Sequence, residues 1–118
     1  MAAATMAGPV LTDASQSPPF TMSGTYTLVG IARAKTHRRD ALVSQLAALR
    51  SRGLTEPGCL DYHVGQDAED ARVFVIYMVW DSKRALESHL NRPYMRDFHA
   101  ARADFVEGDF SFRWLNAA

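Results

Sequence analysis

Cysteine is nearly absent from this chain of 118 residues, which contains only Cys59. A single cysteine excludes an intrachain disulfide framework and favours a reducing, cytoplasmic location. The chain also lacks a charge bias, because 13 basic residues balance 13 acidic ones, and this disfavours nucleic acid as a partner. No apolar run approaches the ~20 residues of a membrane helix, and the N-terminus lacks the features of a secretory signal. We therefore expect a cytoplasmic protein with one folded domain.

The motifs of metal, phosphate and nucleophilic chemistry are missing as well. Neither a glycine-rich phosphate loop nor a GxSxG elbow occurs. One cysteine cannot make a zinc site, and no metal-ligand spacing relates the four histidines, His37, His63, His89 and His99. We therefore expect no metal and no cofactor, so an oxygenase reaction would have to draw its electrons from the organic substrate.

The chain does contain an uninterrupted run of β-branched, aromatic and aliphatic residues, VFVIYMVW at 73–80. Such a run predicts a buried strand. Alternation along it places Phe74, Ile76, Met78 and Trp80 on one face and Val73, Val75, Tyr77 and Val79 on the other. Both faces are apolar. Helices of this chain should cover the first face, and the second should stay exposed until another copy of the chain covers it in a homodimer.

Turn signals and periodicity on either side of this strand predict the other elements. Asp81 or Ser82 caps a helix that is broken at Pro93, and Gly53 is a suitable C′ residue for an earlier helix. Gly108 ends the last helical region. The strands and helices alternate as β-α-β-β-α-β, at 25–34, 41–53, 59–65, 73–80, 81–105 and 109–115. This order is the ferredoxin-like α+β plan, with one antiparallel sheet and both helices on one face.

Residues 1–23 are rich in Ala, Ser, Thr, Gly and Pro and show no sustained periodicity. Their composition predicts a mobile leader in front of a folded domain at 24–118. The alternative is an arm that swaps onto a partner subunit.

Three stretches, EPGCLDYHVGQD, VFVIYMVWDSKRALESHL and RPYMRDF, closely resemble the antibiotic biosynthesis monooxygenase family in order and spacing. The resemblance covers roughly residues 25–115. It implies a dimeric α/β barrel. Several family members oxidise phenols, hydroquinones or anthrones with O₂ and use no metal or flavin, whereas others degrade haem or isomerise small signalling sugars.

Two departures from the family pattern narrow these expectations. Members commonly carry a glutamate two residues before the tryptophan, and Met78 stands there in this chain. An acid that relatives have in the pocket is therefore missing from that position. Haem-degrading relatives use an asparagine in the first strand, and residues 25–34 contain none, which disfavours haem.

His89 and Trp80 are the candidate catalytic residues. His89 lies on the apolar face of its predicted helix, and an imidazole titrates near neutrality, as a general base requires. The alternative is a core histidine that is bonded to a backbone carbonyl. Trp80 ends the central strand on the helix side, where it either stacks on a flat substrate ring or fills the core.

Six further residues are candidates for substrate binding: His63, Phe74, Met78, Met95, Phe98 and Phe112. Each also has a purely structural interpretation, as an exposed strand histidine or as part of the core. Alternation from Cys59 to Gly65 places His63 on one face with Cys59 and Asp61, and Leu60, Tyr62 and Val64 on the other. Arg33 and Arg113 could hold an anionic substrate group, or they could be solvated strand edges.

Three hypotheses about function remain open. The first is a cofactor-independent monooxygenase that acts on an aromatic or quinol-type small molecule with O₂. The second is a proton-transfer enzyme of the same fold, such as an isomerase, that uses His89 and His63 on a small oxygenated metabolite. The third is a dimeric binding protein without catalysis. Converging titratable groups in the pocket would favour the second hypothesis over the third, and an all-apolar cavity would favour the third.

Overall fold

A computed structural model of the protein describes residues 24–115, so the predicted leader at 1–23 lies outside the described residues. The elements follow the predicted β-α-β-β-α-β order, with the second helix broken at Pro93. They are β2 (Tyr26–Ala34), α1 (Arg39–Gly53), β3 (Cys59–Gln66), β4 (Val73–Trp80), α2 (Lys83–Leu90), α3 (Pro93–Ala101), a 3₁₀ turn (Arg102–Asp104) and β5 (Val106–Leu115). The ferredoxin-like prediction is confirmed.

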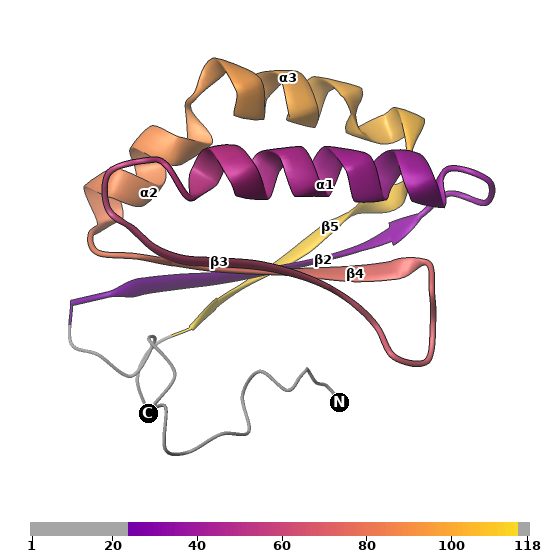
Figure 1. The fold of residues 1–118 in the computed structure, drawn as a ribbon, viewed down its shortest axis with the longest axis horizontal. Coiled ribbons are helices and arrows are strands. Elements are labelled where there is room, and N and C mark those ends of the chain that lie inside the picture. The colour runs from indigo at the N-terminus through magenta and orange to yellow at the C-terminus, as the bar shows by residue number, and fades with distance from the viewer. Residues whose placement is uncertain (1–23, 116–118) are drawn as a thin grey trace.

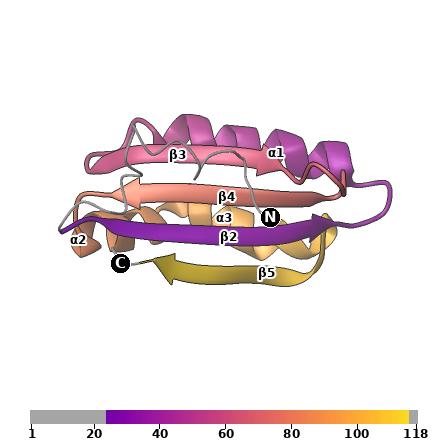
Figure 2. The same cartoon turned by 90° about the horizontal axis from the view of Figure 1, so that it is seen from below.

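The four strands form one antiparallel sheet in the order β3-β4-β2-β5. All helices lie on one side of this sheet (Figure 1), and the view from the sheet side shows the strands in front of them (Figure 2). The β4 strand occupies an inner position between β3 and β2, as its continuous apolar sequence predicts.

The core fills the layer between the sheet and the helices. The strands contribute apolar side chains of β4 and β2, and each helix contributes an apolar stripe. The main contributors are Leu28, Phe74, Ile76, Met78, Trp80, Leu42, Leu46, Leu49, Leu86, Met95 and Phe98. Burial of such side chains stabilises the fold by about 1.5–3 kcal/mol each.

Gly53 does not act as a C′ residue, because it is the last residue of α1 itself. A Cβ atom at this position would lie 2.5 Å from Cε2 of Tyr62. The Tyr62 ring is almost fully buried, at 1% exposure, so it has no room to move away. Glycine is therefore required here by the close approach of a ring rather than by a left-handed backbone.

Two bulges change the predicted strands. Ile31 of β2 pairs with Ser111 of β5, but Arg33, two positions further along, pairs with Glu107. The β5 strand therefore contains extra, unpaired residues around Gly108, whose φ of 70° suits glycine. The prediction that Gly108 ends a helix is wrong, and β5 begins at Val106 rather than at residue 109.

The second bulge lies in β3. Cys59 pairs with Trp80 and Asp61 with Val79, so the alternation slips between Cys59 and Asp61. Cys59 therefore packs against the core, on the side opposite Asp61, and Leu60 is 50% exposed. The predicted grouping of Cys59 with Asp61, and of Leu60 with Tyr62, is wrong for this reason.

The outer face of the sheet is less open than expected. Tyr77 and Val79 are 6% and 0% exposed in the single chain, and Val73 and Val75 are half-buried. The expectation that all four are exposed is therefore wrong. Alternation defines the face of a side chain but not its shielding by neighbours, and the register sets Val79 between Thr27 and Asp61 on the adjacent strands.

Candidate functional site

The centre of the candidate site is the stacked pair of Trp80 and His89. The Ser82 hydroxyl caps α2 by accepting the backbone N–H of Ala85 at 3.1 Å, and this start directs His89 toward the sheet. The His89 ring is fully buried. It lies 4.7 Å from the Trp80 ring between centroids, with 28° between the planes.

Glu56 brings a buried carboxylate to this pair. Its side chain is 7% exposed, and its Oε2 lies 3.0 Å from Nδ1 of His89. The Tyr94 hydroxyl donates to the same oxygen, and Nε of Arg92 forms an ion pair with Oε1 at 3.3 Å. Three residues from two helices and their junction thus converge on one carboxylate.

The loop between α1 and β3 positions Glu56 through its backbone. The Glu56 N–H donates to the carbonyl of Gly53 at 3.0 Å, and the Asp81 N–H donates to the carbonyl of Gly58 at 2.8 Å. Gly58 has a φ of 87°, and a Cβ there would lie 2.5 Å from Cβ of Ala85. Glycine therefore lets this loop dock on the first turn of α2, close to the histidine.

The electrostatics of this cluster favour an ionised Glu56. Burial alone would raise the pKa of its carboxyl, but hydrogen bonds from Tyr94 and His89 and the nearby charge of Arg92 outweigh burial and lower it. Burial and the adjacent carboxylate raise the pKa of Tyr94. An ionised carboxylate only accepts, so Nδ1 of His89 carries a proton and donates it to Glu56.

Nε2 of His89 has no hydrogen-bond partner among residues 24–115. The same holds, within these residues, for the hydroxyl of Tyr62 and Nε1 of Trp80, whose rings flank His89 at centroid distances of 6.0 and 4.7 Å. Buried polar atoms are usually paired. His89 and two of the rings that flank it therefore each carry a buried polar atom without a partner in the described part of the chain.

A cleft of about 340 Å³ opens beside this cluster. Its lining comes from the end of α1, the following loop and the α2–α3 junction, and consists of Arg52, Thr55, Glu56, Arg92, Pro93 and Tyr94. The guanidinium carbon of Arg52 lies 4.9 Å from the centre of the Tyr94 ring. Glu56 and Tyr94 thus belong both to the cleft and to the buried hydrogen-bond network.

The predicted catalytic residues, His89 and Trp80, are in contact, but most predicted binding residues lie elsewhere. Four of them are core residues at 4% exposure, namely Phe74, Met78, Met95 and Phe98. Phe112 is 43% exposed on β5, where it stacks on Phe110 and packs against Gly30. Phe74 and Trp80 lie six positions apart on β4, about 20 Å at ~3.3 Å per residue, so one small ligand cannot contact both.

His63 is not part of the cluster. It contacts Asp61, with 2.8 Å between Nε2 and Oδ1, and its side chain is 53% exposed. It lines a separate hollow of about 430 Å³ between α1 and the edge strand β3, together with Phe74 and Arg50. The structure therefore brings His63 and Phe74 together, but not with His89.

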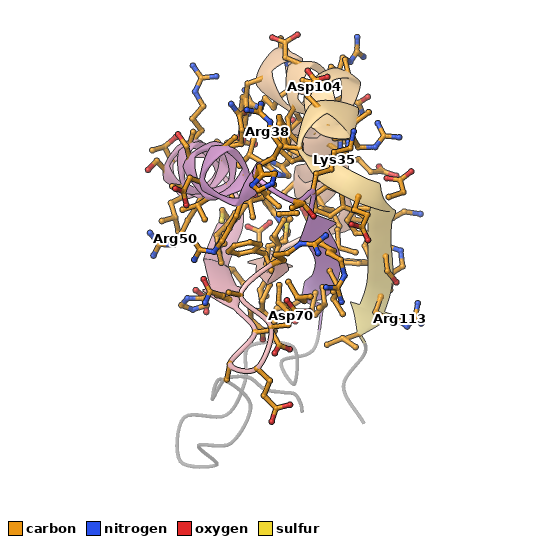
Figure 3. The ribbon with its side chains drawn as sticks, turned by 90° about the vertical axis from the view of Figure 1, so that its right-hand side faces the viewer. Lys35, Arg38, Arg50, Asp70, Asp104 and Arg113 are labelled. Atoms are coloured by element: carbon orange, nitrogen blue, oxygen red, sulfur yellow. The ribbon has the colours of Figure 1, made fainter. Side chains whose placement is uncertain are left out.

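The two arginines predicted to hold an anion also lie away from the cleft. Arg33 pairs with Asp70 of the β3–β4 hairpin. Arg113 lies on β5, at the opposite side of the molecule from Arg50 and α1 (Figure 3). The arginines of the cleft are Arg52 and Arg92, which the sequence analysis did not single out.

Glu56 is the main residue that sequence reasoning missed. Glu56-Pro57-Gly58 indicates a turn, and a turn residue is expected to be solvated. The sequence did contain one signal for Glu56. This carboxylate lies next to a glycine turn, and the turn immediately precedes a strand that packs against His89. Within residues 24–115, no three His, Cys, Asp or Glu side chains gather as a metal site would require, and no helix is long and apolar enough to cross a membrane.

The sequence pattern described as "antibiotic biosynthesis monooxygenase" matches residues 25–101, well over half of the chain. The chain belongs to this family. Family membership and the observed fold support a small-molecule-binding, monooxygenase-like domain, of a kind often found as a dimer. Glu56 is the carboxylate that contacts the histidine in this chain.

Solved structures of this fold include a protein of Pseudomonas aeruginosa that is 28% identical to the chain. Its TM-score is 0.75, and the match covers 80% of this chain and 95% of that one. A candidate antibiotic biosynthesis monooxygenase from Nitrosomonas europaea is 18% identical, with a TM-score of 0.75 and coverage of 80% and 91%. At that identity the likeness concerns the fold alone.

A curated relative, an uncharacterised protein of Synechocystis, is 24% identical over 79 residues. The match covers 67% of this chain and 54% of that protein, so the chain spans about half the length of this relative.

Proposed function

We propose that the protein is a cofactor-independent monooxygenase that oxidises an aromatic, quinol-type small molecule with O₂. One observation carries this proposal: the buried His89 is bonded at Nδ1 to the buried carboxylate of Glu56, and its Nε2 is unpaired among the described residues. A carboxylate that orients a histidine in this way makes Nε2 the basic atom. Family membership supplies the reaction class.

The first step is removal of a phenolic proton by Nε2 of His89. The imidazolium that forms is stabilised by Glu56, whose carboxylate lies 3.0 Å from Nδ1. The resulting anion passes one electron to O₂, and the substrate radical and superoxide combine to a peroxide. Loss of water then leaves a new carbonyl, so that one oxygen atom enters the substrate and the other leaves as water. A hydroquinone and O₂ thus yield a hydroxyquinone and water, with both electron pairs supplied by the substrate.

The neighbours of His89 have distinct roles in this scheme. Glu56 is a positioning residue, because it acts through the imidazole. Trp80 covers one face of the imidazole and helps to exclude water, which protects the radical and peroxide intermediates. The hydroxyl of Tyr62 is a donor available to the developing oxyanion, since it is unpaired within the described part of the chain.

Oxygen uptake with a panel of hydroquinones and phenols tests the proposal. Wild-type protein should consume O₂ and form a quinone product without added metal, flavin or nicotinamide. His89→Gln keeps the size of the side chain and one hydrogen bond but cannot take the proton, so it should abolish most of the uptake. Equal uptake by the two proteins would contradict the role of His89.

A proton-transfer reaction without O₂ is the second candidate. The convergence of Glu56, His89 and Tyr94 favours it over a binding protein without catalysis, because titratable groups meet beside the cleft. Exchange of substrate hydrogen for solvent deuterium without oxygen uptake would identify this activity.

We also propose a homodimer through the outer face of the sheet. Val73 and Val75 are half-buried there, and Ile31, in register with Val75, is 40% exposed. Val75→Asp should weaken the dimer more than tenfold, because a carboxylate would lose its hydration at the interface. Sedimentation would measure this shift, and a wild-type protein that is monomeric at micromolar concentration would contradict the proposal.

A further inference from the structure

Two guanidinium groups from different elements border the cleft. Arg52 belongs to the last turn of α1, and Arg92 lies at the junction of α2 and α3. The Arg52 side chain lies over the Tyr94 ring, at 4.9 Å from its centre. The ion pair of Arg92 with Glu56 holds its stem in place while 41% of the side chain remains exposed. Both groups are therefore positioned from within the protein and still reach solvent.

The charges of the cleft do not cancel. Glu56 is its one acidic residue, and it already accepts hydrogen bonds from Tyr94 and His89 in addition to its ion pair with Arg92. Two positive groups and one negative group leave a net charge of one positive. Among the described residues, the guanidinium N–H groups of Arg52 have no hydrogen-bond acceptor. The terminal guanidinium nitrogens of Arg92 have none there either. Such planar donor groups match a carboxylate.

The rest of the lining suits a flat ring. The Tyr94 ring and Pro93 provide apolar surface between the arginines. A volume of about 340 Å³ accommodates a molecule with one or two aromatic rings. A monoanion balances the residual charge, whereas a doubly charged phosphate would bring a second negative charge toward Glu56.

We propose that Arg52 and Arg92 form a carboxylate subsite, so that the substrate is an aromatic acid with a phenolic hydroxyl. This inference rests on the proposed function and names the substrate class for the same site. The carboxylate lies between the two guanidinium groups at the rim, and the phenolic end points inward to Glu56 and Tyr94, the cleft residues that contact His89. Arg52 is thus a residue that determines specificity, and the phenol end undergoes the chemistry.

Binding of a matched pair of probes tests the subsite without any turnover. Gentisate and gentisyl alcohol share a hydroquinone ring and differ in a carboxylate against a hydroxymethyl group. Calorimetry under anaerobic conditions should show that the full-length wild-type protein binds gentisate about tenfold more tightly, the effect of one additional charge-assisted contact at a partly exposed site. Added salt should reduce this preference, because the arginines are partly exposed.

Arg52→Gln should remove most of the preference for gentisate and leave the affinity for gentisyl alcohol unchanged. Arg96→Gln is the matched control, since Arg96 is an exposed arginine of α3 that does not line the cleft. Equal affinity of wild-type protein for the two probes, no saturable binding of gentisate, or equal losses in the two variants would overturn the subsite. Tight, Arg52-dependent binding without oxygen uptake would contradict the monooxygenase proposal alone.

Discussion

Two histidine–carboxylate pairs lie in different parts of the molecule, one between the α1–β3 loop and α2 and the other on β3, and their N–O distances are nearly the same. His89 lies 3.0 Å from Glu56, and His63 lies 2.8 Å from Asp61. Their surroundings differ. The side chains of the first pair are 0% and 7% exposed, and those of the second are 53% and 29% exposed.

Burial determines what such a pair contributes. Water screens the exposed pair, and exposed pairs typically contribute at most about 1 kcal/mol. The buried pair has lost its hydration and depends on protein groups, which here are the Tyr94 hydroxyl and Arg92. A histidine and a carboxylate therefore form a buried hydrogen-bonded network in one place and a solvent-exposed contact in the other.

The two pairs should differ most in their contribution to catalysis. His89→Gln should lower kcat about 10²–10⁴-fold, the usual cost of losing a positioned base, whereas His63→Gln should change it less than about twofold. Oxygen uptake with the most active quinol measures both variants, and circular dichroism checks that each is folded. If His63→Gln caused the larger loss, the assignment of the base would move to the other pair.

Removal of the carboxylate charge should lower the free energy of unfolding more at the buried pair than at the exposed pair. Glu56→Gln should reduce the free energy of unfolding by about 2–4 kcal/mol at neutral pH, because it breaks a buried pair and leaves Arg92 without its partner. Asp61→Asn should cost about 0.5 kcal/mol or less. Urea denaturation compares the variants, and similar losses at the two positions would show that burial does not distinguish them.

Alanine substitutions at two glycines compare the packing around the buried pair with the packing around the exposed pair. Gly53→Ala places a methyl group 2.5 Å from the Tyr62 ring, which flanks His89, whereas no heavy atom lies within 4 Å of a Cβ at Gly65 of β3. Overpacking costs about 1–3 kcal/mol, and alanine regains up to ~1 kcal/mol of helix propensity. We expect a net loss of about 1–2 kcal/mol for Gly53→Ala and little change for Gly65→Ala. Thermal unfolding measures the difference, and an unchanged melting temperature for Gly53→Ala would show that Tyr62 can yield.

Local signals predicted much of this architecture. The observed β4 has the predicted bounds, Val73–Trp80, because an unbroken β-branched and aromatic run needs no partner to be recognised. The cap at Ser82 and the break at Pro93 are likewise local. The bulge at Cys59–Asp61 depends instead on how one strand pairs with another, and single-strand alternation carries no information about it.

The candidate site was less accessible to prediction for the same reason. Trp80 and His89 belong to adjacent elements, so their proximity followed from the strand–helix pattern. Glu56 contacts His89 across 33 positions of sequence, and a helix or strand period does not extend that far. Phe74, Phe112 and Trp80 all lie on the side of the sheet that faces the helices. The face on which a residue lies does not indicate how far along the strand it is from another residue.

The smallest expected effect is the pH dependence of the buried pair, and it tests whether Glu56 is ionised. The fold lowers the pKa of its carboxyl from the ordinary value of 4.5, so the folded state favours the ionised form. Its contribution to stability is therefore complete above about pH 4.5 and is lost as the pH falls through the lower, folded-state value. Glu56→Gln has no such titration.

The difference in the free energy of unfolding between wild type and Glu56→Gln should consequently be largest near neutrality and should shrink below pH 4.5. The size of this change measures how far the fold lowers the pKa of the Glu56 carboxyl. Asp61→Asn, from the exposed pair, serves as the control. If the Glu56→Gln difference instead grew on acidification, the carboxyl would be protonated in the folded protein, and Nδ1 of His89 would have to accept its proton.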